Sequence, residues 1–253
     1  MYNKFPDARI LDVNLTKGEI KTRIIPGDIY RLYPGGSALG LYLILQDMDP
    51  KADPLSPENM LVFSVSPFTG LPISGTSRVT VTTKSPLTGT IGDSQAGGFF
   101  PMHLKSNGWD SVLFRGKSEK PVYLYIDGDK AELKDAQNVW GKVTGEAEEI
   151  IRDELDNKDI EIAQIGAGGE NLVKYASIIN MCNRANGRNG TGAVMGSKNL
   201  KALVIKKGKG LDPYDKEGFS EFSKRVVNMI KENPNVEGLG EHGTDGDLEE
   251  FSN

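Results

Sequence analysis

The sequence predicts an α+β fold, and three observations favour this class over a regular βαβ repeat. Short strands and hairpins alternate irregularly with a few short helices along the 253 residues. The chain contains 30 Gly and 13 Pro, and glycine forms roughly 12% of it against a usual share of about 7%. We also find no internal repeat with a period of about 20–50 residues.

The first half of the chain is expected to begin with a β-hairpin whose turn lies at residues 16–18. A helix should start after the Pro-Gly-Gly sequence at residues 34–36 and stop at Asp49-Pro50. The elements expected next are a strand at residues 61–65, a Val- and Thr-rich strand at 78–83, a short helix at 101–107 and a strand at 111–115.

The second half should contain another hairpin, which turns at Asp127-Gly128. Thr144 is a plausible N-cap for the helix that follows. Strands are then expected at residues 160–165 and 202–205, and an amphipathic helix is expected from Phe219 to Ile230. We place a domain boundary near residue 211, with one domain over residues 1–211 and the start of a helical domain over residues 212–253.

Composition excludes several kinds of site. One Cys rules out an intramolecular disulfide framework, a Cys-rich zinc site and an iron–sulfur cluster held by this chain alone. With two His residues, a metal would have to be bound mainly by oxygen or arrive with ligands on a cofactor.

The charge is unevenly distributed. The net charge is −5, but residues 232–253 hold seven acids and no Lys or Arg, so the remainder is near neutral. We therefore expect no nucleic-acid partner and a disordered, Gly-rich acidic end. Because no apolar run is long enough to span a bilayer and no signal peptide is visible, we expect no membrane partner and a cytoplasmic location.

Two segments, residues 74–98 and 183–198, combine Arg, Gly and small polar residues. Glycine allows the backbone to approach a ligand closely, and Arg adds a fork of charged donors. This composition suggests a phosphate-bearing anion, although tight surface turns with solvated Arg side chains are an open alternative. The segment at residues 187–192 lacks the Gly-Lys-Ser/Thr ending of a P-loop, and the segment that starts at Gly166 does not complete the Gly-x-Gly-x-x-Gly dinucleotide pattern, because its sixth position is Asn171.

Three longer motifs carry a family resemblance: TKSPLTG at residues 83–89, GAGGENLV at 166–173 and GAVMGSKNLKA at 192–202. In this order and spacing they resemble the N-terminal domain of the aldehyde ferredoxin oxidoreductase family, from about residue 9 to residue 206. The resemblance implies two β-sheets, related by pseudo-two-fold symmetry, that form a base for a tungsten or molybdenum bis-pterin cofactor. It also implies a Mg²⁺ ion that bridges the pterin phosphates.

The resemblance can be carried over to individual positions. The cofactor-binding residues it implies are Arg78, Gln95, Gly97, Gly98, Arg184, Ala185, Gly187 and Arg188. The main-chain carbonyls of Gln95 and Ala185 would hold the Mg²⁺. The sequence departs from the family pattern at Ser37, at Gln95 and at Asn189, which stands in place of a Gly.

The resemblance further implies an enzyme that oxidises aldehydes to carboxylic acids with ferredoxin as electron acceptor. Its [4Fe–4S] cluster and catalytic residues would lie in later domains, so we expect this chain to be a fragment, and we assign no catalytic residue. A homo-oligomer is compatible with the family. Two alternatives stay open: a relative with the same cofactor that acts on another substrate, such as an aromatic acyl-thioester, and a non-catalytic scaffold.

The remaining candidates have simpler explanations. Cys182 is expected to be a small buried hydrophobe, and His103 is expected to have a packing or surface role. Trp109 and Trp140 should pack in or near the core, and Asp93 should cap backbone N–H groups in a turn.

Overall fold

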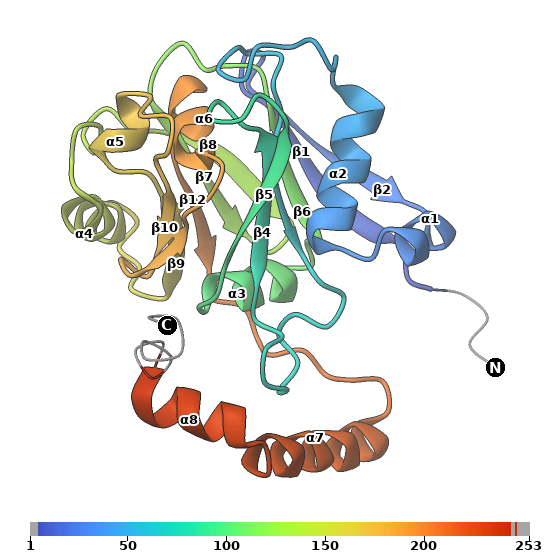
Figure 1. Cartoon of the computed structure of the whole chain (residues 1–253). Coiled ribbons are helices and arrows are strands. Elements are labelled where there is room, and N and C mark those ends of the chain that lie inside the picture. Colours follow the sequence, from blue (N-terminus) through green and yellow to red (C-terminus); the bar gives the residue numbers. More distant parts are fainter. Residues whose placement is uncertain (1–4, 244–245, 247–253) are drawn as a thin grey trace. The chain divides into compact units, whose positions relative to one another are not determined.

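Two six-stranded sheets dominate the part of the chain that this computed structural model describes, residues 5–243 and 246 (Figure 1). The strands of the first sheet are β1 (Ala8–Asn14), β2 (Glu19–Ile25), β3 (Leu61–Val65), β4 (Val79–Lys84), β5 (Ile91–Ala96) and β6 (Ser111–Arg115). Their order is β2-β1-β6-β3-β4-β5. β1 and β6 are parallel, and the other neighbours are antiparallel.

The second sheet has the same kind of arrangement. Its strands are β7 (Val122–Asp127), β8 (Lys130–Asp135), β9 (Ile160–Gln164), β10 (Ile178–Asn180), β11 (Arg184–Asn186) and β12 (Leu200–Lys206). Their order is β8-β7-β12-β9-β10-β11, with β7 and β12 parallel and the other neighbours antiparallel.

Each strand of the first sheet therefore corresponds to the strand six places later in the chain. In each sheet, the first two strands form a hairpin at one edge. The last strand of that half, β6 or β12, lies parallel to the first, β1 or β7. The opposite edge is β5 or β11. This correspondence confirms the expected α+β fold of two related sheets. The sequence shows no internal repeat, because the two halves share their strand order but not their residues.

The helices are α1 (Gly27–Leu32), α2 (Gly36–Asp47), α3 (Phe100–Ser106), α4 (Thr144–Glu154), α5 (Ala167–Glu170), α6 (Thr191–Ser197), α7 (Lys216–Lys231) and α8 (Pro234–His242). Helices α1 to α6 lie between strands of the two sheets in the chain, and α7 and α8 follow the last strand. Helix α3 follows β5 and leads into β6, just as α6 follows β11 and leads into β12. Figure 1 shows α2 beside the first sheet and α4 beside the second.

Alternation along the central strands explains how the layers are held together. On β3, Leu61 and Phe63 belong to a core cluster shared by both sheets, whereas Val62 packs with apolar residues of α2. On β9, Ala163 joins the shared core, and Ile162 packs with apolar residues of α4. Because successive strand residues point to opposite faces, one strand supplies both interfaces.

The chain divides into two compact units, which we describe separately. The first contains the residues up to Gly70 together with Ser77–Gly210, and the second contains Leu71–Thr76 and the residues from Leu211 onward. Both sheets lie in the first unit. The assignment of residues 1–211 and 212–253 to a cofactor-binding domain and the start of a helical domain stays a prediction.

Helix α7 in the second unit is amphipathic, as expected, and starts at an Asp215 cap whose side chain accepts a hydrogen bond from Gly218 N. The expectation of a disordered acidic end is wrong for Pro234–His242, which form α8. Asn233 caps this helix and Pro234 occupies its first position, and both are helix-start signals. The rest of the predicted acidic end, except residues 243 and 246, lies outside the described residues.

Thr144 is also not the N-cap that the sequence suggested. Val143 occupies that position and offers no side-chain cap, and Thr144 is the first helical residue. Among the described residues, no helix combines the length and the apolar character needed to cross a membrane.

Candidate functional site

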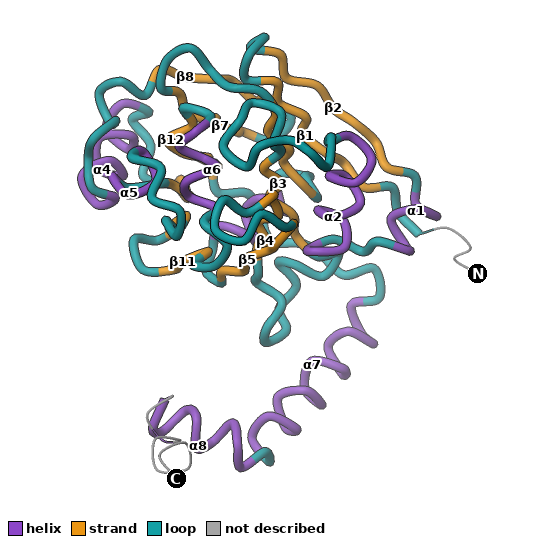
Figure 2. The backbone as a smooth tube through the Cα atoms, turned by 45° about the horizontal axis from the view of Figure 1, so that its top comes forward, coloured by secondary structure: helices purple, strands orange, loops and turns teal. Residues whose placement is uncertain are grey.

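The edge strands β5 and β11 lie next to each other in the first unit (Figure 2). They carry a polar pocket of about 460 Å³. Its lining residues are Arg78, Gln95, Ala96, Gly97, Gly98, Asn183, Arg184 and Ala185. Six of the eight predicted cofactor-binding residues are thus brought together from segments about 90 residues apart. Gly187 and Arg188 do not line this pocket but directly follow β11.

Gln95 and Ala185 occupy equivalent positions in the two sheets. Gln95 is the next-to-last residue of β5 and pairs with Thr80, the second residue of β4. Ala185 is the next-to-last residue of β11 and pairs with Ile179, the second residue of β10. The fold therefore brings to one pocket two backbone segments that share the same place in their sheets.

The arginine side chains of the pocket are exposed and have no bonding partner in the part of the chain that the structure describes. The guanidinium groups of Arg78 and Arg184 make no hydrogen bond or ion pair with any described residue, and the same is true of Arg188. By contrast, Arg115 bonds the Asp12 carboxylate and Arg152 bonds that of Glu148. Unpaired guanidinium groups that converge on a polar pocket favour an anionic ligand.

Gly98 is required by the geometry of the pocket wall. Its φ is +112°, and a Cβ at this position would lie 2.5 Å from Asn180 Oδ1. The Gly98 carbonyl accepts a hydrogen bond from Ser77 Oγ at 2.5 Å. A Cβ on Gly97 would find its nearest neighbour, Ser77 O, at 3.7 Å, so space alone does not require glycine there.

Hydrogen bonds from Asn186, Arg188 and Asn189 to residues of β5 hold the two edges together. Asn186 Nδ2 donates to Ser94 O at 2.7 Å, and Arg188 N donates to Ser94 Oγ at 3.0 Å. Asn189 Nδ2 donates to Asp93 O at 2.7 Å, and Asn189 has a φ of +63°. Asn tolerates this left-handed conformation better than most residues, which explains how it can stand in place of a Gly.

The turn between β10 and β11 borders the pocket and contains Met181 and Cys182, both with positive φ. Cys182 is exposed, so the prediction of a buried hydrophobe is wrong. Its position in a hairpin turn leaves the sulfur at the surface, where it donates to Glu148 Oε2 at 3.2 Å.

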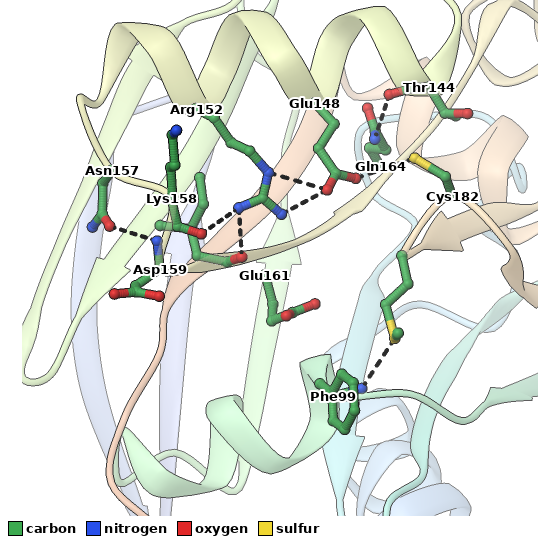
Figure 3. Close-up of polar contacts among 12 residues, drawn as sticks. Phe99, Thr144, Glu148, Arg152, Asn157, Lys158, Asp159, Glu161, Gln164 and Cys182 are labelled. Atoms are coloured by element: carbon green, nitrogen blue, oxygen red, sulfur yellow. Dashed lines mark hydrogen bonds and ion pairs between the residues drawn. The ribbon is translucent and has the colours of Figure 1, made fainter.

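Figure 3 shows the Cys182 thiol beside the Glu148 carboxylate, which also pairs with Arg152. Partial burial and the Glu148 carboxylate raise the pKa of Cys182 to about 11, so the thiol is protonated at neutral pH.

The other candidates are mostly structural. His103 is buried, its Nδ1 accepts a hydrogen bond from Gly208 N, and burial lowers its pKa. Trp109 is a core residue and Trp140 packs against the core, as predicted. Asp93 lies in β5 and accepts a hydrogen bond from Ser37 Oγ, so it does not cap a turn as predicted.

No group of three or more His, Cys, Asp or Glu side chains that could hold a metal ion occurs among residues 5–243 and 246. The oxygen donors of the pocket that suit a hard cation such as Mg²⁺ are main-chain carbonyls and the amides of Gln95 and Asn183.

Comparison with known proteins places the chain in a family. The family described as "Aldehyde ferredoxin oxidoreductase, N-terminal domain" matches residues 10–207. The tungsten-containing aldehyde ferredoxin oxidoreductase of Pyrococcus abyssi is 44% identical over 238 residues, which cover 94% of this chain and 39% of that protein. An aliphatic sulfonate oxidoreductase, WOR-like subunit, of Pyrococcus furiosus is 36% identical over 245 residues, which cover 88% of this chain and 39% of that protein.

A solved structure, the active-site complex BamBC of benzoyl coenzyme A reductase with 1,5-dienoyl-CoA, has a chain with a TM-score of 0.86 and 38% identity. The match covers 90% of this chain and 35% of that one. This chain thus spans about two fifths of the length of the relatives it matches. By sequence and by fold it belongs to the family of aldehyde ferredoxin oxidoreductase N-terminal domains.

Proposed function

We propose that the pocket between β5 and β11 binds the phosphate-bearing part of a tungsten or molybdenum bis-pterin cofactor. The observation that carries the proposal is the convergence of Arg78 and Arg184 on a pocket with glycine backbone, both exposed and with no bonding partner for either guanidinium group among the described residues. This donor set fits a phosphate, which offers oxygen acceptors and negative charge. The tungsten-containing enzymes among the relatives support the identity of the cofactor.

Each part of the pocket would have a distinct task. The guanidinium groups of Arg78 and Arg184 would neutralise the phosphates, and Arg188 would add positive charge beside them. The Gly97 and Gly98 backbone would allow close approach of the ligand. The main-chain carbonyls of Gln95 and Ala185 would hold a Mg²⁺ ion between two phosphates, and such a contact does not depend on the side chain.

We further propose that the whole protein oxidises aldehydes to carboxylic acids. One aldehyde and one water would give the acid, two protons and two electrons, and the bound cofactor would supply this two-electron chemistry. The electrons would pass through a [4Fe–4S] cluster held outside this chain to ferredoxin. A cytoplasmic location and a homo-oligomer belong to the same proposal, and no residue of this chain is assigned to catalysis.

Reduction of an aromatic acyl-thioester is the second candidate. It is favoured by the likeness to the benzoyl coenzyme A reductase complex, at 38% identity over 90% of this chain. The pocket alone does not separate the two candidates, because it would serve the cofactor in both cases.

The test is to purify the protein anaerobically from its source in its longest form and to measure metal, pterin and activity. Tungsten or molybdenum should accompany pterin, and aldehydes should reduce ferredoxin. Activity with an aromatic acyl-thioester alone would select the second candidate. Active protein without either metal or pterin would refute the cofactor proposal.

A further inference from the structure

Asn180, the last residue of β10, has an unusual environment for a polar side chain. It is only 1% exposed. Neither its Oδ1 nor its Nδ2 has a hydrogen-bond partner within the part of the chain that the structure describes. Burial of an amide without partners is unfavourable, because the group loses its bonds to water and gains nothing in return.

Asn59 shows how the same fold treats another buried amide. It is fully buried, and its Nδ2 donates to the carbonyls of Pro54 and Lys84. Its Oδ1 accepts from Thr83 Oγ1 at 3.3 Å and from Lys84 N at 3.2 Å. The two asparagines are therefore equally buried, but the side-chain amide of Asn59 is fully hydrogen-bonded and that of Asn180 has no partner among the described residues.

The Asn180 amide lies against the wall of the pocket. Asn180 pairs with Arg184 across the hairpin, and its Oδ1 would be 2.5 Å from a Cβ on Gly98. The Met181 sulfur is also close to Gly98, at 2.9 Å from the same Cβ position. It accepts a hydrogen bond from Phe99 N at 3.3 Å, a contact drawn in Figure 3. A thioether is a weak acceptor on a flexible side chain, so this contact can be given up at small cost.

We propose that Asn180 is a further residue of this anion site and bonds to one of two phosphate groups that share a Mg²⁺ ion, once the Met181 side chain moves aside. The amide Nδ2 would donate to a phosphate oxygen. The Oδ1 would accept from a water molecule on Mg²⁺, which usually keeps several of its waters. An amide suits such a ligand because it both donates and accepts. The inference rests on the proposed function, since it requires a phosphate ligand in the pocket.

The experiment compares Asn180→Leu with the matched variant Asn59→Leu in the 253-residue chain. Replacing an unpartnered buried amide with an apolar group of similar shape should raise Tm by about 2–4 °C. Asn59→Leu should lower Tm, because it leaves its partners without bonds. Thermal unfolding is then repeated with Mg²⁺ alone, inorganic pyrophosphate alone, and both together.

Magnesium and pyrophosphate together should stabilise the wild-type chain, and Asn180→Leu should weaken this apparent binding by about tenfold or more. Arg184→Ala should weaken it as well, because it removes a charge from the pocket. A lower Tm for Asn180→Leu, a failure of this variant to fold, or unchanged binding would overturn the inference alone. Absence of any shift in the wild type, or no effect of Arg184→Ala, would overturn the phosphate site and the inference with it.

Discussion

Two groups of cationic side chains in the first unit differ in burial and in bonding to protein atoms. Lys198 and Lys201 are fully buried and bonded to protein atoms. Arg78 and Arg184 are exposed and bonded to none of the described residues. The two lysines belong to the motif at residues 192–202, whereas the two arginines lie outside the three motifs that carry the family resemblance.

The difference separates structural charges from charges available to a ligand. A buried cation must be paired inside the protein, because its desolvation is otherwise unfavourable. Lys201 pairs with Glu170, and Lys198 donates to main-chain carbonyls of Asn59 and Gly116. The motif at residues 192–202 is therefore recognisable partly because it packs two buried lysines, whereas the guanidinium groups of Arg78 and Arg184 have no bonding partner among the described residues.

The largest effect is expected at the buried pair. The side chains of Lys201 and Glu170 are 0% and 4% exposed. Lys201→Met should lower the free energy of unfolding by about 3–5 kcal/mol, because the Glu170 carboxylate would stay buried without its partner. Urea unfolding measures this, and the double variant with Glu170→Gln should recover part of the loss. A loss below about 1 kcal/mol would mean that this buried pair contributes no more to stability than an ordinary surface ion pair.

Substitutions at the pocket arginines should weaken ligand binding and leave stability nearly unchanged. Replacing both Arg78 and Arg184 with Ala should weaken binding of magnesium pyrophosphate by at least about 100-fold. It should change Tm by less than about 2 °C, because neither guanidinium group has a hydrogen bond or ion pair to lose among the described residues. Titration calorimetry at low salt and thermal unfolding give the two values. A large loss of stability with little loss of binding would reverse the comparison.

Lys198 should make stability depend on pH. Burial lowers its pKa to about 7, far below that of a lysine in the unfolded chain. Between about pH 7 and pH 10 the unfolded chain binds a proton that the folded protein has released, so this group makes stability rise with pH by at most about 1.4 kcal/mol per unit. Urea unfolding of wild type and Lys198→Met at pH 7, 8 and 9 should show a smaller rise in the variant. Equal slopes would mean that the ammonium stays charged in the folded state.

The smallest effect concerns Cys182, which is exposed but hydrogen-bonded. Because its pKa is raised to about 11, alkylation by iodoacetamide should be slower at pH 8.5 than for an ordinary thiol, whose pKa is about 8.5. Glu148→Gln removes the neighbouring charge and should speed the reaction about threefold or more. Equal rates for the two proteins would show that the carboxylate does not control the thiol.

Strands buried on both faces could be located from sequence. The predicted strands at residues 61–65 and 111–115 have the same bounds in the structure as β3 and β6. Their apolar residues alone specify an extended, buried segment.

The edge strands were missed for a physical reason. β5 has the sequence IGDSQA and β11 is three polar or small residues long, so neither shows an alternating apolar pattern. Their conformation comes from pairing with β4 and β10 and from bonds such as that of Asn186 Nδ2 to Ser94 O. Short polar edge strands are stabilised by neighbours distant in sequence, which no local pattern records.

The sequence by itself determined the family, the α+β class and most of the residues of the candidate site, since motifs and residue types are local properties. The tertiary structure alone decided which of these residues meet. It brought Gln95 and Ala185 to equivalent edges, left the guanidinium groups of Arg78 and Arg184 without a bonding partner among the described residues, and buried the amide of Asn180 beside Gly98. These are consequences of long-range strand pairing and packing, which place side chains by contacts between distant segments.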